Sequence, residues 1–175
     1  MTKSHGFAPI VGDRLSVLVL GTLPSRRSLA TGHYYGHPRN QFWPIMGALF
    51  DAGPDKPYAD RIKALTEAGI GVWDVLAAAE RPGSLDASIE NATAVANDFA
   101  GFFDVHGVPP HVFFNGRTAS ALFRRHVSVA LDRLPEAPES HVLPSTSPAH
   151  AAMTFDEKLE RWAAVKRLAQ TDDVR

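Results

Sequence analysis

The 175-residue chain contains no cysteine. Disulfides, Cys-ligated zinc, iron–sulfur clusters and thiol catalysis are therefore excluded. No apolar run approaches the roughly 20 residues that a membrane-spanning helix needs, and the start of the chain lacks the apolar core of a signal peptide. The formal net charge is only −1, so no overall basic field indicates a nucleic-acid partner. We expect a soluble, intracellular, cytoplasmic protein that does not contact a membrane.

Neither an internal repeat nor a long linker divides the chain. Gly and Pro, thirteen of each, are scattered between short elements, and hydrophobic residues make up 45%, as in globular proteins. We predict a single domain over residues 1–175, with a core from about residue 13 to 170, since one domain usually holds about 100–200 residues.

Apolar runs predict three strands. Leu15–Leu20 is apolar on both faces and ends at Gly21, which is typical of a central parallel strand. His111–Asn115 and the short His141–Leu143 follow the same pattern, whereas Ile70–Leu76 fits either a strand or an extended loop.

Helical patterns fall between these runs. They cover Lys56–Ala68, Thr93–His106 and Arg117–Val127, and a last helix opens with the capping-box pattern Thr154–Glu157. Alternating strands and helices predict an α/β fold, a three-layer αβα domain with a central, mainly parallel sheet.

Each predicted strand ends in an unusual segment. The first runs into Gly21–Ser25, the second ends on Asn115, and the third enters the hydroxyl-rich loop Leu143–Pro148. Ligands of open α/β sheets bind beyond the carboxyl ends of the strands. If the three strands are neighbours, their ends form one ligand-binding edge.

The first connection is locally basic and aromatic. Residues 14–50 contain no Asp or Glu but several Arg, His and aromatic residues, a combination that suits a phosphate chain with a stacked base. We assign Phe42 and Trp43 to the core, and Tyr34 and Tyr35 to ligand contact.

Other chemistries fit less well. His33 and His37 are separated by Gly36 and precede Pro38, so they cannot form a helical zinc pair. The serines of the third loop lack the glycine-flanked elbow of a hydrolase nucleophile, and no dinucleotide or P-loop motif is present. Those serines could equally be turn formers.

Several motifs together resemble the uracil-DNA glycosylase superfamily, most closely its hypoxanthine-DNA glycosylase branch. Leu20–Ser25 and Gly32–Trp43 resemble its first motif region, including the specific run from Tyr34 to Trp43. Gly71–Leu76 with Arg81–Asp86 looks like the middle region, and Leu143–Ala149 looks like the DNA-intercalating motif.

The resemblance implies a monofunctional DNA glycosylase of base excision repair. Such an enzyme flips uracil or hypoxanthine out of DNA and hydrolyses its N-glycosidic bond. DNA would be the partner, near the nucleoid in a bacterium, and neither a metal nor another cofactor is needed. We expect a monomer.

By resemblance, Asn40 is the catalytic residue and orients the attacking water or the sugar; alternatively, it only caps the following helix. Tyr35 would stack on the flipped base, and Asn115 would hydrogen-bond its Watson–Crick edge or merely end a strand. The backbone N–H groups of Gly21, Thr22 and Leu23 would add contacts to the base.

The loop 144–150 would be the wedge that fills the hole in the DNA, with Ala149 or His150 entering the base stack. Phosphate contacts would come from a further set of polar and basic residues: Ser25, Arg26, Arg27, Arg39, Ser145 and Ser147.

Leu23 departs from a second branch that the first motif also resembles, the mismatch-specific uracil and thymine branch of the superfamily, which has an asparagine or another polar activating residue there. If Asn40 does not replace that function, the protein would bind lesion or abasic DNA with slow cleavage or none. A weaker alternative is a hydrolase of free nucleosides.

Overall fold

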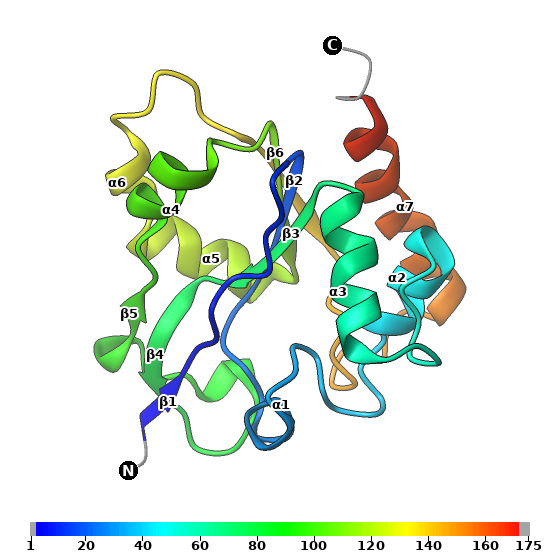
Figure 1. The fold of residues 1–175 in the computed structure, drawn as a ribbon. Coiled ribbons are helices and arrows are strands. Elements are labelled where there is room, and N and C mark those ends of the chain that lie inside the picture. The colour runs from blue at the N-terminus through cyan, green and yellow to red at the C-terminus, as the bar shows by residue number, and fades with distance from the viewer. Residues whose placement is uncertain (1–2, 172–175) are drawn as a thin grey trace.

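The computed structural model describes residues 3–171 (Figure 1). Its central sheet has four parallel strands in the order β3-β2-β6-β7. Their bounds are Val17–Gly21 (β2), Ile70–Asp74 (β3), His111–Asn115 (β6) and Glu139–Leu143 (β7). Every residue of β2 and β3 is buried, as both-sided apolar patterns predict.

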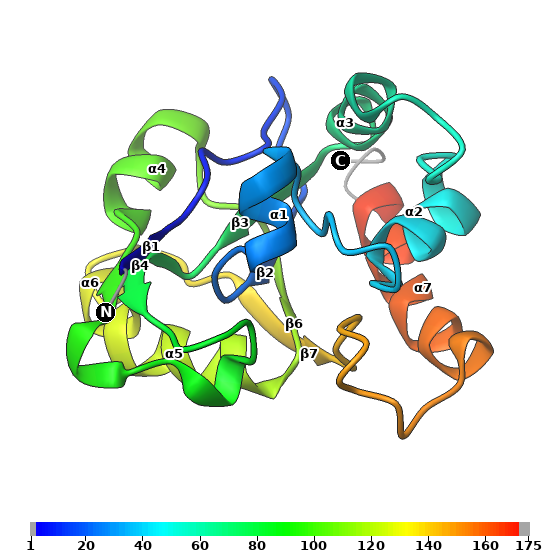
Figure 2. The ribbon, with the colours of Figure 1, turned by 90° about the horizontal axis from the view of Figure 1, so that it is seen from below.

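Helices cover both faces of this sheet (Figures 1 and 2). Leu18 and Leu20 of β2 pack with α4, α5 and α6, whereas Val17 and Val19 pack with α2, α3 and α7. The predicted three-layer αβα fold is confirmed. The helices are Phe42–Phe50 (α2), Tyr58–Glu67 (α3), Phe99–His106 (α4), Arg117–His126 (α5), Ser128–Leu131 (α6) and Phe155–Thr171 (α7).

A small antiparallel sheet, ordered β1-β4-β5, lies beside the central one. It consists of Lys3–His5 (β1), Leu76–Glu80 (β4) and Val95–Ala96 (β5). The run Ile70–Leu76, for which the sequence fits either a strand or a loop, contains β3 and the first residue of β4. Val75 divides the two strands, and its N–H donates to the Gly21 carbonyl at 2.9 Å. The end of β3 is therefore the junction of the two sheets.

The helix predicted from Thr93 is wrong in its first half. Asp98 caps α4, because its Oδ1 accepts the Gly101 N–H at 3.0 Å, and the helix begins only at Phe99. Val95, which lies within the predicted helix, instead pairs with Ala78 of β4 and is 48% exposed. A two-residue strand is too short to leave a periodic pattern, so the sequence favoured a longer helix.

Other differences are smaller. A short helix, Arg26–Thr31 (α1), occupies part of the predicted long connection, and 3₁₀ turns cover Asp86–Ser88 (η1) and Asn91–Thr93 (η2). Ile10 is buried and bridges to Val72, so packing begins slightly before residue 13. Within residues 3–171, no helix combines the length and apolarity needed to cross a bilayer.

Candidate active site

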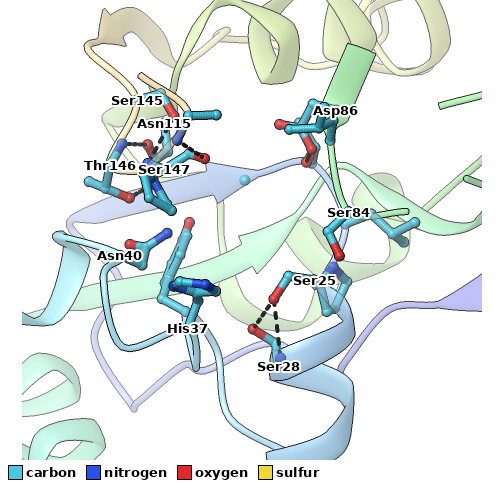
Figure 3. A pocket seen from close by; sticks show the side chains of 18 of the residues that line it. Ser25, Ser28, His37, Asn40, Ser84, Asp86, Asn115, Ser145, Thr146 and Ser147 are labelled. Carbon is cyan, nitrogen blue, oxygen red and sulfur yellow. Dashed lines mark hydrogen bonds between the residues drawn. The ribbon is translucent and has the colours of Figure 1, made fainter. Parts of the chain in front are cut away.

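A cavity of about 620 Å³ opens at the carboxyl edge of the central sheet. Its walls come from the exits of β2 and β4, the segment before α2, the end of β6 and the loop after β7 (Figure 3). The three strand ends predicted to share one edge are confirmed as neighbours. The volume lies within the range of about 300–1,000 Å³ that is usual for small-ligand sites.

Gly21 forms the middle of the cavity floor. Asp74 pairs with it on β3, and Asn115 ends the neighbouring strand β6. Adjacent strands lie about 4.8 Å apart, so the backbones of these two polar residues stand roughly 10 Å apart across a position without a side chain. A Cβ at Gly21 would lie 2.5 Å from Asp74 Oδ1 and 2.9 Å from the Tyr35 hydroxyl oxygen. The absence of a side chain here keeps the floor open.

Tyr35 projects over this floor from a strained backbone. Its φ of 53° is left-handed, which is unfavourable for a bulky side chain and is often found at functional sites. The ring stacks on Phe42, with centroids 4.1 Å apart, and its hydroxyl is buried next to the Asn115 side chain. Burial, then the charge of Asp74, raises the pKa of this phenol, so it stays protonated.

Tyr34 does not share this position. It is 4% exposed, and its hydroxyl donates to the Ala8 carbonyl at 2.9 Å. The Trp43 indole donates to the Tyr34 carbonyl at 2.8 Å. Tyr34 therefore borders the cavity and also packs in the core, and contact between its side chain and a ligand stays a prediction. Phe42 and Trp43 are core residues, as predicted.

Asn40 lines the cavity, and Figure 3 shows its side chain turned toward it. Its Oδ1 accepts the Phe42 N–H at 2.9 Å, at the beginning of α2. The N-cap residue of α2 is Gln41, so the capping alternative is present only as this bond from the residue before the cap. The bond uses the amide oxygen and not the Nδ2 donors, so capping and a catalytic role are compatible.

Asn115 ties the third loop to β6. Its Nδ2 donates to the Thr146 hydroxyl and its Oδ1 accepts the Thr146 N–H, both at 2.9 Å. An amide has two N–H donors and two oxygen lone pairs, so one of each is left by these bonds. Asn115 is therefore more than a strand terminator, and base recognition by its second donor and acceptor stays a prediction.

A buried network that the sequence did not predict holds the exit of β2. The Arg81 guanidinium donates to the Leu23 carbonyl at 3.2 Å and to the Pro24 carbonyl, and lies 3.6 Å from Asp86 Oδ1. The same Asp86 oxygen accepts the Thr22 hydroxyl at 2.7 Å. Leu23 itself is 5% exposed and packs in the core. The Arg81–Asp86 motif thus fixes the backbone at the cavity wall.

Asp74 is another residue of the site that the sequence analysis did not identify. It is 4% exposed, and its Oδ2 has no hydrogen-bond partner in the part of the chain that is described. Burial, and then the charge of Asp86, raise the pKa of this carboxyl to about 7, although Arg81 acts to lower it. A clue was present in the sequence, because Asp74 is a polar residue that ends an apolar strand, β3, just as Asn115 ends β6.

Ionisation of this buried carboxyl should lower stability as pH rises to neutral and above. Its pKa is about 7 when folded and near 3.8 when unfolded. The folded state therefore binds the proton more tightly, and stability falls as pH rises from about 4 through 7. Asp74→Asn is expected to be more stable than wild type at pH 8 by up to roughly 4 kcal/mol, with little difference near pH 4. Urea unfolding at both pH values checks this; equal differences at both would contradict it.

Only some of the residues predicted to bind DNA phosphates line the cavity. Ser25 caps α1 by accepting the Ser28 N–H at 3.1 Å, and it also lines the cavity. Arg39 is exposed on the cavity lining. Arg26 and Arg27 are exposed on α1 and do not line the cavity. Cation contacts from α1 to DNA therefore require DNA to extend beyond the cavity mouth.

Hydrogen bonds to its own serine side chains stabilise the turns of the predicted wedge loop, residues 144–150. Ser145 Oγ accepts the Ser147 N–H, and Ser147 Oγ accepts the Ala149 N–H, each at 3.2 Å. The turn-forming alternative is thus present, although both serines line the cavity. Ala149 is exposed, whereas His150 is partly buried and its carbonyl accepts the Lys158 ammonium at 2.7 Å. The geometry favours Ala149 over His150 as the tip.

Histidines near a carboxylate occur at the opposite end of the sheet. His111, Glu139 and His141 lie on β6 and β7, with ring nitrogens 3.5 and 3.7 Å from the Glu139 carboxylate. Glu139 is largely exposed and the His141 ring stacks on Phe113. Cross-strand pairing explains this cluster without an ion. His33 stacks on Tyr58.

Comparisons with known proteins give a family match, two similar sequences and one similar structure. The family model described as Uracil DNA glycosylase superfamily matches residues 9–169. A hypoxanthine DNA glycosylase of Methanosarcina acetivorans is 33% identical over 164 residues, covering 93% of this chain and 98% of that relative. One from Methanosarcina barkeri is 36% identical over 118 residues, covering 66% and 72%. An M. acetivorans NMR structure, described as a candidate uracil DNA glycosylase, has a TM-score of 0.78 and 31% identity, covering 97% and 99%.

Proposed function

Because this chain belongs to the uracil DNA glycosylase superfamily and is a DNA glycosylase, we propose that it removes a deaminated base, hypoxanthine first and uracil second, from DNA. The observation that carries the proposal is the open floor at Gly21, which has Asp74 on one side, Asn115 on the other and Tyr35 above it. A base can reach this floor only after it leaves the DNA stack.

In this proposal the flipped base stacks on the free face of Tyr35, opposite the face that Phe42 covers. Asn115 pairs with the N–H and carbonyl that deamination creates on the Watson–Crick edge. The bond from C1′ to the base nitrogen breaks, and its electron pair leaves with the base. A water oriented by Asn40 forms the new bond to C1′ and loses a proton to solvent.

The DNA backbone would lie across the cavity mouth. The tip of the loop after β7 would enter the base stack, and the serines with Arg39 would bind phosphates. Arg26 and Arg27 on α1 would contact DNA farther out. The small net charge favours a short footprint by one monomeric domain, and no step of the proposed hydrolysis needs a metal or another cofactor.

Base release tests the proposal directly. Oligonucleotides that carry one deoxyinosine or deoxyuridine, single-stranded or opposite each normal base, are incubated with the protein and then treated with alkali. Strand breaks at the lesion support the proposal, with deoxyinosine expected to react fastest. Intact strands on every substrate at high enzyme concentration would retire it, and rapid turnover of free inosine with no DNA cleavage would indicate a nucleoside hydrolase instead.

A second candidate is a lesion binder that cleaves slowly or not at all. It is favoured by Leu23, a buried core residue that cannot orient water at the exit of β2. Mobility shifts with plain, inosine-containing and abasic duplexes separate the two functions. Tight, lesion-specific binding without base release would favour the binder.

A further inference from the structure

At the cavity floor, the buried Asp74 Oδ2 has no hydrogen-bond partner within residues 3–171. The buried Tyr35 hydroxyl lies close by, next to the Asn115 side chain, and an added Cβ on Gly21 would touch both the Tyr35 oxygen and Asp74 Oδ1. A buried polar group without a hydrogen bond is costly and uncommon in folded proteins. Both residues line the cavity, so a bound ligand is the natural source of the partner that Asp74 Oδ2 lacks.

We propose that Asp74 is a further catalytic residue, which in its protonated form gives its proton to N7 of flipped hypoxanthine as the glycosidic bond breaks. The proposal rests on the function proposed above. It assigns to the base a proton donor in addition to the water oriented by Asn40.

The position of Asp74 in the sheet supports contact with the base. Asp74 and Asn115 lie on opposite sides of Gly21 at the same edge, because β3 and β6 both pair with β2. If Asn115 takes the Watson–Crick edge of a purine over Gly21, the imidazole edge with N7 is turned toward Asp74. The Asn97 side chain fixes the backbone of Asp74 at this edge, because its Nδ2 donates to the Asp74 backbone carbonyl at 2.7 Å.

The surroundings allow a protonated carboxyl near neutral pH. Burial raises its pKa to about 7, which suits a general acid working at that pH. The charged groups facing it are Asp86 of η1, which raises the pKa, and Arg81 after β4, which lowers it. The neighbouring tyrosines, Tyr34 and Tyr35, are neutral, because burial raises both of their pKa values far above the neutral range. Tyr35 can therefore donate a hydrogen bond but is a poor source of a proton.

The step balances. The C1′–N9 bond breaks and its electron pair enters the purine, while the Asp74 proton moves to N7, so hypoxanthine leaves neutral. Water adds to C1′ and releases one proton, and the Asp74 carboxylate takes up one proton from solvent before the next turnover. The acid thus prevents a full negative charge from building on the leaving base.

Single-turnover release of hypoxanthine between pH 5.5 and 9 tests the assignment. Wild type is expected to slow about tenfold per pH unit above the Asp74 pKa. Asp74→Asn should be about 100-fold slower at pH 6.5 and should lack this descending limb, with lesion binding retained. Asp104→Asn, the same change at an exposed position of α4, should match wild type.

A second variant tests the same acid while leaving the Asp74 side chain in place. Asp86→Asn removes a charge that raises the Asp74 pKa, so the descending limb should move to lower pH. A wild-type rate that rises through pH 7, or equal profiles for wild type and both variants, would overturn the assignment while the glycosylase function stands.

An atomic substitution in the substrate identifies the proton acceptor. Replacing deoxyinosine by 7-deaza-deoxyinosine, which has carbon in place of N7, should slow wild type far more than Asp74→Asn. Equal losses in the two proteins would contradict proton transfer to N7. If wild type releases no hypoxanthine at all, the proposed function itself fails and the assignment fails with it.

Discussion

Asn40→Ala is expected to slow hypoxanthine release about 100- to 1,000-fold, the usual effect of removing one positioned hydrogen-bonding group from an active site. DNA binding should change little, because the amide would act on water or sugar at the bond that breaks. Single-turnover kinetics with a matching titration of lesion DNA separates the two effects.

The capping bond of Asn40 supplies a matched control. Its Oδ1 accepts the Phe42 N–H, and a serine oxygen can make the same kind of bond. Asn40→Ser therefore keeps an acceptor for the helix and removes the amide donors. If Asn40 is catalytic, the serine variant is as slow as the alanine variant. If it only caps α2, Asn40→Ser should react like wild type.

Gly21→Ala is expected to close the cavity floor. The new Cβ would lie 2.5 Å from Asp74 Oδ1 and 2.9 Å from the Tyr35 oxygen, so both side chains would have to move. A displacement of about 1 Å in an active site can cost about 100-fold in rate, and we expect at least that loss in hypoxanthine release.

Abasic DNA provides the internal control for this variant. It carries no base to place over Gly21, so its binding should be nearly unchanged while binding of deoxyinosine DNA weakens. Equal weakening on both DNAs would show that the substitution damages the fold or the phosphate contacts instead. Thermal melting of the variant distinguishes these two causes.

The central sheet could be predicted because its strands are continuous apolar runs ending at clear stop residues. His111–Asn115 has the predicted bounds, and the Thr154–Glu157 capping box forms both of its hydrogen bonds. The antiparallel sheet could not be predicted, since β5 has two residues and β4 follows β3 after one. The pairing partner of such short strands is decided by tertiary contacts.

The site likewise contains residues that the sequence predicts and residues that only the structure reveals. Asn40, Tyr35 and Asn115 come together at one cavity, but Asp74 gains its significance only from its register with Gly21. The importance of Arg81 likewise depends on backbone carbonyls that no sequence pattern displays. Polar residues whose role depends on neighbours from another strand can therefore be identified only in the folded structure.

The central claim is that a base leaving DNA enters the space over Gly21. A crystal structure of Asn40→Ala bound to a duplex with one deoxyinosine tests it most directly. The account predicts hypoxanthine stacked on Tyr35, with Asn115 at one edge and Asp74 at the other. Hypoxanthine still paired within the duplex, or bound away from Gly21 with the cavity empty, would contradict it.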